Sequence, residues 1–121
     1  MNSSNIKKYI LTNCKTIANI SQKRFEIEMN IPDTVIICSV ANITESVKIQ
    51  IKYIPNQLLI ETSSLRNSFL NSDFKTTFEE FTSDLYDALY ELVKPIGLSV
   101  YIYRNDGKLM DWGVTYSNLN K

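Results

Sequence analysis

The amino-acid sequence predicts one α+β domain, in which an antiparallel sheet of four strands is covered on one face by two helices. Three observations predict this fold class. The 121 residues are about one domain's length. Segments near both ends of the chain alternate apolar and polar residues, as half-buried strands do. Between them, apolar residues recur every three or four positions, as they do in amphipathic helices.

The strands are predicted from this alternation. The predicted strands are residues 23–30, 45–54, 58–61, 98–104 and 109–116. The clearest pattern lies in residues 45–54, where one face carries Val47, Ile49, Ile51 and Tyr53. Pro32-Asp33 is expected to break the first strand before a short apolar stretch. Asn105-Asp106-Gly107 predicts a hairpin turn between the last two strands.

The helices are predicted from spacing and from their end signals. A short helix is expected within residues 4–20, in an N-terminal extension of residues 1–21, and a second within residues 63–72. The long helix repeats Phe78, Phe81, Leu85, Ala88 or Leu89, and Leu92. Thr76 or Thr77 can cap it, with Glu79 or Glu80 closing a capping box. Lys94 and Pro95 favour its end.

The composition excludes several classes of protein. Thirteen basic and thirteen acidic residues cancel, which disfavours general nucleic-acid binding. No apolar run is long enough for a membrane span or a signal peptide. Two cysteines make no disulfide framework, so we expect a cytoplasmic protein. The absence of histidine excludes Ser-His-Asp and Cys-His hydrolases and imidazole zinc sites, and we expect no metal.

An unpartnered sheet face predicts self-association. One helical layer leaves the other face of the sheet open, and aromatic and apolar residues on the last strands add bulk that this layer does not cover. These residues are Tyr101, Tyr103, Met110 and Trp112. We therefore expect a homo-oligomer.

Cys38 is the candidate nucleophile. It ends an apolar stretch, so it is either a buried structural cysteine or a reactive thiol that needs a nearby proton carrier. Glu45 lies seven residues on, at the start of the next strand. It is either that proton carrier or a solvated carboxylate. Cys14 is expected to pack in or near the core.

Several other charged residues also have two interpretations. Glu79 and Glu80 either cap the long helix or accept N–H bonds from the edge of a purine-like ring. Arg66 and Lys75 either face a phosphate or are ordinary surface charges.

With its elements in this order, the chain resembles the tunnelling-fold family, and most of all the NADPH-dependent 7-cyano-7-deazaguanine reductases of queuosine biosynthesis. The resemblance covers roughly residues 24–117. The family places its nucleophilic Cys six positions after a Pro, here Cys38 after Pro32. Seven residues later it carries an acid, an Asp where this chain has Glu45. Its Tyr-Ile-Pro strand end matches residues 53–55.

The same resemblance implies the binding residues. Six residues after the Tyr-Ile-Pro, the family begins a cofactor signature, Glu-Ser-Lys-Ser-Leu-Lys. The matching positions here are Glu61, Thr62, Ser63, Ser64, Leu65 and Arg66. The family's substrate-binding His and Glu align with Phe78 and Glu79, or the Glu with Glu80 if a gap lies inside the helix.

The chain also departs from the family pattern. Ser39 replaces a Pro, residues 41–44 replace Thr-Gly-Gln-Pro, and Ser63 replaces the first Lys of the cofactor signature. The Arg-Gly-Gly near the C-terminus is absent, with only Gly107 nearby.

The implied activity is NADPH-dependent reduction of 7-cyano-7-deazaguanine to 7-aminomethyl-7-deazaguanine, in queuosine tRNA modification. It would proceed through a Cys38 thioimidate, with Glu45 as proton donor and sites at the subunit interfaces. The expected partner is a small deazapurine, with no direct contact to nucleic acid or membrane. Two alternatives stay open: a related enzyme that resolves the thioimidate with ammonia or an amine, and a non-catalytic oligomer that binds a purine or pterin or only assembles.

Overall fold

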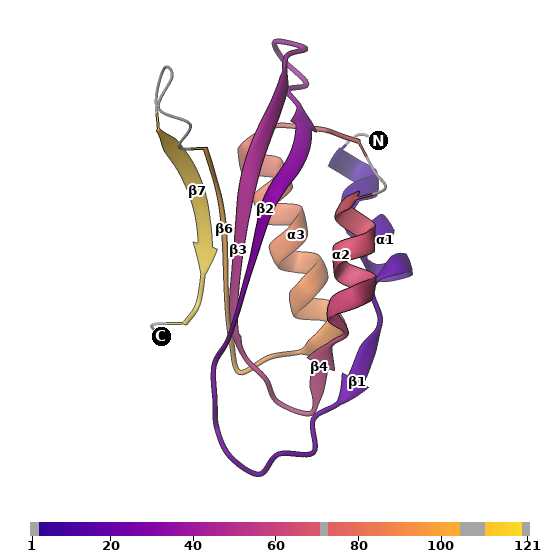
Figure 1. Cartoon of the computed structure of the whole chain (residues 1–121), viewed down its shortest axis with the longest axis vertical. Coiled ribbons are helices and arrows are strands. Elements are labelled where there is room, and N and C mark those ends of the chain that lie inside the picture. Colours follow the sequence, from indigo (N-terminus) through magenta and orange to yellow (C-terminus); the bar gives the residue numbers. More distant parts are fainter. Residues whose placement is uncertain (1–2, 71–72, 105–110, 120–121) are drawn as a thin grey trace.

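The structure is a computed structural model of the chain, and it describes residues 3–70, 73–104 and 111–119. Figure 1 shows the elements along the chain. They are α1 (Ser3–Asn13), β1 (Thr16–Ala18), β2 (Ile27–Ile37), β3 (Thr44–Ile54), β4 (Leu58–Ile60), α2 (Thr62–Leu70), β5 (Phe74–Lys75), α3 (Phe78–Val93), β6 (Gly97–Arg104) and β7 (Trp112–Ser117).

The main sheet has the strand order β5-β2-β3-β6-β7, and the helices lie on one side of it (Figure 1). The pairs within β2-β3-β6-β7 are antiparallel, whereas the short β5 runs parallel to β2. β1 and β4 form a separate antiparallel pair. The predicted α+β class is confirmed. The short β5 is added to the four strands predicted for this sheet, and the predicted strand at residues 58–61 lies in the separate pair as β4. The helix α1 joins the helical layer by packing on α3.

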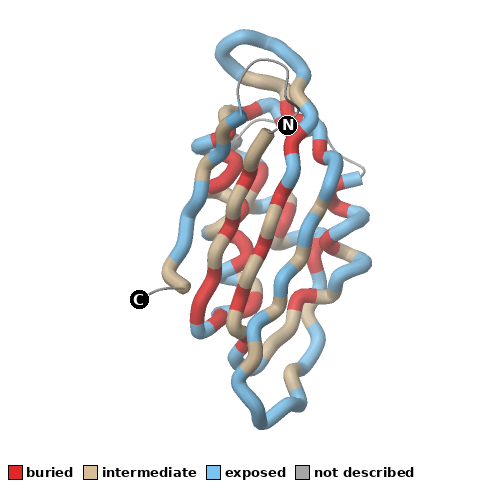
Figure 2. Tube along the Cα trace, turned by 60° about the vertical axis from the view of Figure 1, so that its left-hand side comes forward, coloured by how far each residue is buried: buried red, intermediate tan, exposed pale blue. Residues whose placement is uncertain are grey.

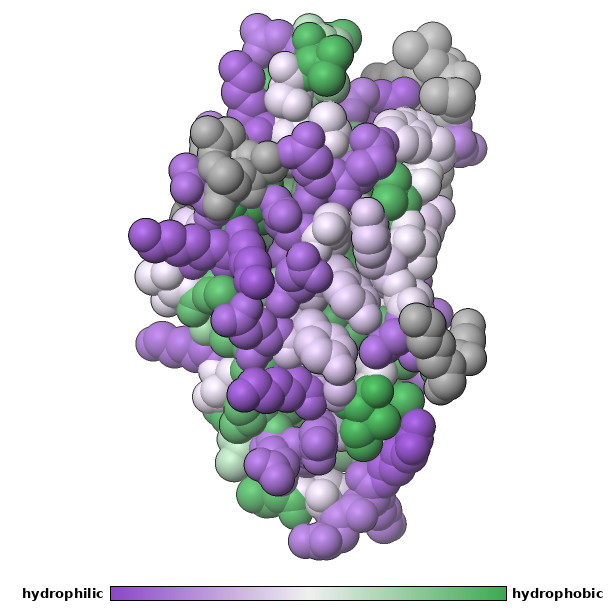
Figure 3. Space-filling model, turned by 180° about the vertical axis from the view of Figure 1, so that it is seen from behind, coloured by the Kyte–Doolittle hydropathy of each residue, from purple (hydrophilic) through white to green (hydrophobic). Residues whose placement is uncertain are grey.

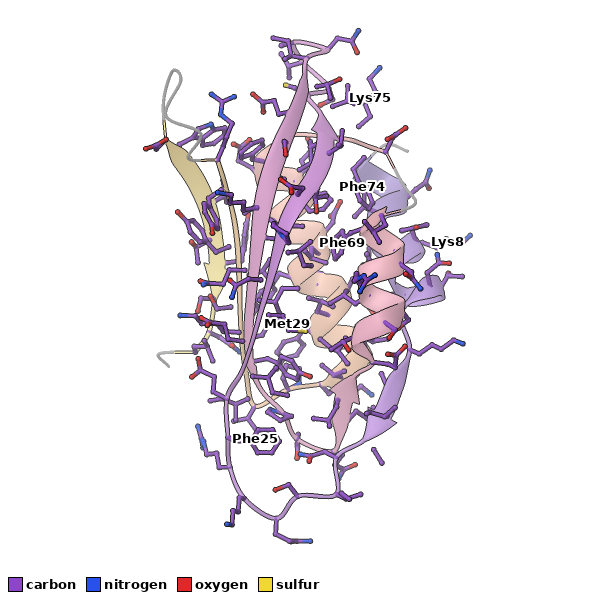
Figure 4. The ribbon with its side chains drawn as sticks, in the orientation of Figure 1. Lys8, Phe25, Met29, Phe69, Phe74 and Lys75 are labelled. Carbon is purple, nitrogen blue, oxygen red and sulfur yellow. The ribbon has the colours of Figure 1, made fainter. Side chains whose placement is uncertain are left out.

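The core lies between the sheet and the helices. Buried residues alternate along the central strands, as Figure 2 shows, and the predicted inward set of β3 is at most 1% exposed. Aromatic rings join the helices to the sheet: Phe74 on β5 lies 4.9 Å from Phe81 on α3 and 6.1 Å from Phe69 on α2, measured between ring centroids. Figure 4 shows Phe69 and Phe74 between α2 and the strands. This cluster fixes β5 beside the end of β2.

The predicted break at Pro32-Asp33 is wrong. β2 runs from Ile27 to Ile37, and its register against β3 shifts between Ile31 and Thr34. A bulge accommodates a proline in a strand, because the residue without an N–H needs no partner there. Both residues of the pair are exposed.

The ends of the predicted helices also differ. α1 ends at Asn13, so the expected helix within residues 4–20 is confirmed only in its first part. Ile17 lies instead on β1, half-exposed and opposite Leu59. α3 begins at Phe78, and the Thr77 hydroxyl caps it by accepting the N–H of Glu80. The predicted turn at residues 105–107 lies outside the described residues.

The outer face of the sheet is more polar than predicted. Trp112 lies on the helix-covered face, where its ring stacks on Phe78 with centroids 4.4 Å apart. Tyr101 and Tyr103 alternate with buried residues, so they lie on the outer face, stacked at 4.6 Å. A Cβ at Gly113 would lie 2.6 Å from the Tyr101 ring, so glycine lets these rings lie flat. Met110 lies outside the described residues.

No helix within the described ranges is long and apolar enough to cross a membrane.

Candidate functional site

Cys38 directly follows β2, at the end of the sheet where β5 joins it. On one side its backbone N–H donates to Ile43, at 2.9 Å. On the other side the flanking residues bond to Thr76, which lies between β5 and α3. Thr76 N–H donates to the Ile37 carbonyl at 2.9 Å, and Ser39 N–H donates to the Thr76 carbonyl at 3.4 Å. Cys38 is therefore held between a hairpin loop and the segment that leads into α3.

The hairpin loop folds back over the thiol. Asn42 has a φ of 56°, a left-handed conformation that asparagine tolerates, and its N–H donates to the Cys38 carbonyl at 2.8 Å. This turn brings the N–H of Ala41 to 3.5 Å from the Cys38 Sγ. The Cys38 sulfur is therefore an acceptor for a backbone N–H of its own loop. Cys38 is partly exposed, whereas Cys14 is buried.

The tip of this loop is apolar. Val40 is 85% exposed and Ile43 is 58% exposed. The hydrophobic patch at the top of Figure 3 lies over this loop. Apolar side chains exposed beside a thiol are typical of a surface that contacts a ligand or another chain.

Glu45 lies on the same face of the sheet as Cys38. It is directly opposite Ile36 in the β2–β3 register, and Ile36 is fully buried under the helices. Opposed residues of an antiparallel pair point to the same face, and so do residues two apart on one strand. Cys38 and Glu45 are therefore diagonal neighbours, roughly 7–8 Å apart between Cα atoms.

Arg104, which the sequence analysis did not select, pairs with Glu45. Its Nη1 donates to Glu45 Oε1 at 2.8 Å, and both side chains are mostly buried. Both residues continue the inward-facing alternation of their strands, Glu45 before Val47 and Arg104 after Ile102. Two opposite charges at core-facing positions of strands were the signal that could have identified the pair.

The start of α3 presents the candidate base-binding residues. Glu79 and Glu80 lie in its first turn, and both are exposed. Phe78 is 4% exposed under Trp112, so it supports the site as a packed ring. Thr76 and Thr77 connect this turn to Cys38, so the carboxylates and the thiol belong to the same end of the molecule.

Residues 61–66 have mostly structural roles. The Glu61 carboxylate accepts the N–H groups of Ser63 at 2.7 Å and Ser64 at 2.9 Å, which caps α2. These two backbone bonds lower the pKa of Glu61. The Ser64 hydroxyl accepts the Lys15 N–H, and Leu65 is buried. Ser63 and Arg66 are exposed, as is the neighbouring Thr62, so these side chains remain available to a ligand.

Arg66 also borders a hollow of about 310 Å³ between α2 and the first half of β2. The hollow is mostly apolar, lined by Met29, Ile31, Pro32 and Leu65 among others. No group of three or more His, Cys, Asp or Glu side chains in the part of the chain that the structure describes is arranged to hold a metal ion.

Comparisons with known proteins agree with this arrangement. No protein-family profile matches the chain. It is 32% identical over 82 residues to the NADPH-dependent 7-cyano-7-deazaguanine reductase of Aquifex aeolicus (strain VF5), an alignment that covers 65% of this chain and 62% of the relative. The chain thus spans less than two thirds of that relative's length.

A solved structure shows the same fold. The apo crystal structure of the archaeosine synthase QueF-Like superposes with a TM-score of 0.63 and 15% identity, covering 80% of this chain and 94% of that one. The fold, the spacing around Cys38 and the sequence match point to one origin. The chain therefore has the tunnelling fold of that archaeosine synthase, and in sequence it resembles the NADPH-dependent 7-cyano-7-deazaguanine reductases.

Proposed function

We propose that this chain is a deazaguanine-modifying enzyme in which the Cys38 thiol adds to the nitrile carbon of a 7-cyano-7-deazaguanine-type base. The observation that carries the proposal is the environment of Cys38. The residue is partly exposed, the Ala41 N–H is 3.5 Å from its Sγ, and Glu45 shares its face of the sheet. The name of the similar reductase supplies the substrate class.

The addition needs no other reactant. Glu45, held as an ion-pair acceptor by Arg104, takes the proton of the Cys38 thiol. The thiolate forms a bond to the nitrile carbon, and one π pair of the nitrile moves to nitrogen. Glu45 returns the proton to that nitrogen, and the product is a neutral thioimidate. Glu45 thus acts first as base and then as acid, whereas the family resemblance alone implies only a proton donor.

Base recognition is assigned to Glu79, with Glu80 as the second choice. An exposed carboxylate in the first turn of α3 can accept two N–H groups from the edge of a guanine-like ring. Glu80 is the second choice, because it matches the family's Glu only if an alignment gap lies inside the helix. A deazaguanine bound here would span the short distance from the helix start to Cys38.

The residues predicted to hold NADPH fit a phosphate poorly within this chain. The N–H groups of Ser63 and Ser64 are already bound by the Glu61 carboxylate, whose negative charge repels another anion. Ser63 stands where the family has a lysine. The thioimidate therefore has two possible fates. One is reduction to the primary amine, which the name of the similar reductase implies. The other is displacement of the Cys38 sulfur by ammonia or an amine, which is favoured because the Glu61 cap occupies the N–H groups that a phosphate would need.

Intact-protein mass spectrometry with 7-cyano-7-deazaguanine tests the proposal. We expect a mass increase equal to one molecule of base in the wild type and in Cys14→Ala, and none in Cys38→Ala. Loss of the adduct with NADPH consumption identifies the reductase. Loss of the adduct on addition of ammonia, without NADPH, identifies the other enzyme. If no adduct forms under any condition, the proposal is contradicted, and the remaining alternative is a protein that binds a base or only assembles.

Calorimetry with 7-cyano-7-deazaguanine on two further variants tests base recognition. A hydrogen bond to a charged group contributes roughly 1.5–3 kcal/mol, so Glu79→Gln should weaken base binding about tenfold or more. Glu80→Gln serves as the matched control one residue away. Unchanged affinity in both variants would exclude this turn as the recognition site.

A further inference from the structure

The ion pair between Arg104 and Glu45 is unusual among the charge pairs that join described residues. Its side chains are 16% and 21% exposed, compared with 45% and 56% for Lys7–Glu91. Exposed pairs of the latter kind add little to stability, because water screens them. A half-buried pair beside the candidate nucleophile has a stronger and more directional interaction.

The order of the strands places Glu45 between the other two groups. Cys38 follows β2, Glu45 lies on β3, and Arg104 ends β6, and these are successive neighbours in the sheet. All three continue the helix-facing side of their strands. Arg104 is opposite Trp112, whose ring stacks on Phe78, so its guanidinium lies near the packed start of α3. Arg104 thus holds the carboxylate from the side away from the thiol.

The geometry of the pair is not the one that would stabilise the fold most. Arg104 Nε is buried and has no hydrogen-bond partner among the residues the structure describes. A guanidinium usually satisfies two N–H groups with one carboxylate, and a buried N–H without a partner destabilises the folded state. This arrangement leaves one donor unsatisfied while a single bond, Nη1 to Oε1, holds Glu45.

We propose that Arg104 is a positioning residue that orients the Glu45 carboxylate as the proton acceptor and donor for Cys38. This role rests on the proposed function. Arg104 Nη1 bonds to only one oxygen of the Glu45 carboxylate, Oε1. Because the cation fixes that side of the carboxylate, the other oxygen can point in only a limited range of directions. Arg104 itself exchanges no proton and touches neither the thiol nor the nitrile.

The test is the rate of thioimidate formation, followed by intact mass over time at saturating 7-cyano-7-deazaguanine. Arg104→Met should slow adduct formation at least about tenfold, within the contribution typical of acid–base catalysis, and leave base affinity unchanged. Arg104→Lys should retain part of the rate, because it keeps the charge. Lys7→Met, which removes an exposed ion pair, is the matched control and should leave the rate unchanged.

A double-mutant cycle distinguishes positioning from a structural role. In a Glu45→Gln background, Arg104→Met should cause no further slowing, because its effect passes through Glu45. Multiplicative slowing in the double variant, or a normal rate in Arg104→Met, would overturn the role and leave the proposed function intact. No adduct in the wild type would overturn both. Circular dichroism checks that each variant is folded, and Arg104→Lys keeps the test available if the methionine variant is not.

Discussion

At the scale of single residues, the two thiols of this chain differ in what surrounds them. Cys14 is 5% exposed, its Sγ lies 3.5 Å from the Ser68 hydroxyl, and burial raises its pKa. Cys38 is half-buried at the open end of the sheet, with a backbone N–H directed at its sulfur. Because the thiolate is the reactive form, the raised pKa and the burial of Cys14 disfavour reaction there, and Cys38 is the more exposed of the two.

We therefore expect iodoacetamide to alkylate Cys38 much faster than Cys14 in the folded protein at about pH 7. Peptide mass spectrometry after timed quenching measures the two rates separately. In urea the rates should converge, because unfolding removes both environments. Equal and slow alkylation of both cysteines in the folded chain would make Cys38 an ordinary packed residue.

The sequence alone could bring Cys38 and Glu45 together as candidates, but it could not add Arg104 to them. The first two lie seven residues apart, so their strand and loop spacing brings them together. Arg104 reaches Glu45 across 59 residues. That contact depends on β6 lying beside β3, a long-range pairing that no local pattern specifies. The inward-facing alternation of β3 and β6 identifies the Glu45–Arg104 pair only once these two strands are known to be neighbours.

At the scale of elements, α2 depends on the carboxylate of Glu61. Two backbone N–H bonds lower its pKa from the ordinary 4.5. A group with a lowered folded-state pKa stabilises the fold fully above its unfolded pKa. This stabilisation is lost as the pH falls through the lower, folded value. The capping of α2 should therefore be complete at neutral pH and be lost in acid, below about pH 4.5.

Glu61→Gln should reduce the free energy of unfolding at neutral pH, since the neutral amide lacks the charge that the positive end of the helix favours. The difference from the wild type should shrink as the pH falls through the lowered folded-state pKa of Glu61, because the side chain then takes up its proton. Urea unfolding followed by circular dichroism at several pH values measures this difference. Glu26→Gln, at an exposed carboxylate outside any helix, is the control. A difference that is constant with pH would assign the effect to packing instead.

Element boundaries were less predictable than element types. β2 continues through Pro32-Asp33 because a bulge absorbs the proline, and a bulge has no simple sequence pattern. α1 stops at Asn13 although apolar spacing continues to Ile17, because residues 16–18 pair with β4 instead. In both places a contact between distant segments overrides a local preference.

At the scale of the whole molecule, the helical layer and the sheet leave open strand edges. Among the described strands, β7 pairs only with β6, and its six residues include no charge and no proline. Proteins usually protect an exposed edge with such residues, because an open edge can pair with another chain. The first half of β2 is the opposite edge beyond its short pairing with β5, and it contains Glu28, Pro32 and Asp33.

The fold class was predictable because it follows from alternation, helix spacing and element order, all local in sequence. Which surface would be left open was less predictable. Trp112 was expected to enlarge an apolar outer face, yet it packs under α3. The apolar surface lies instead at the hairpin tip, at Val40 and Ile43, beside Cys38.

We predict that the chain associates edge to edge with copies of itself, into a ring or barrel in which β7 pairs with a neighbouring chain. The unprotected edge supplies backbone donors and acceptors, and the apolar hairpin tip supplies surface to bury near each Cys38. Light scattering at micromolar concentration should report an oligomer. Thr115→Lys places a charge on the exposed edge and should shift the equilibrium toward smaller species, whereas Asn5→Lys on the exposed side of α1 should not. A compact wild-type monomer at that concentration would contradict the prediction, and an oligomer indifferent to both substitutions would exclude β7 as the joining edge.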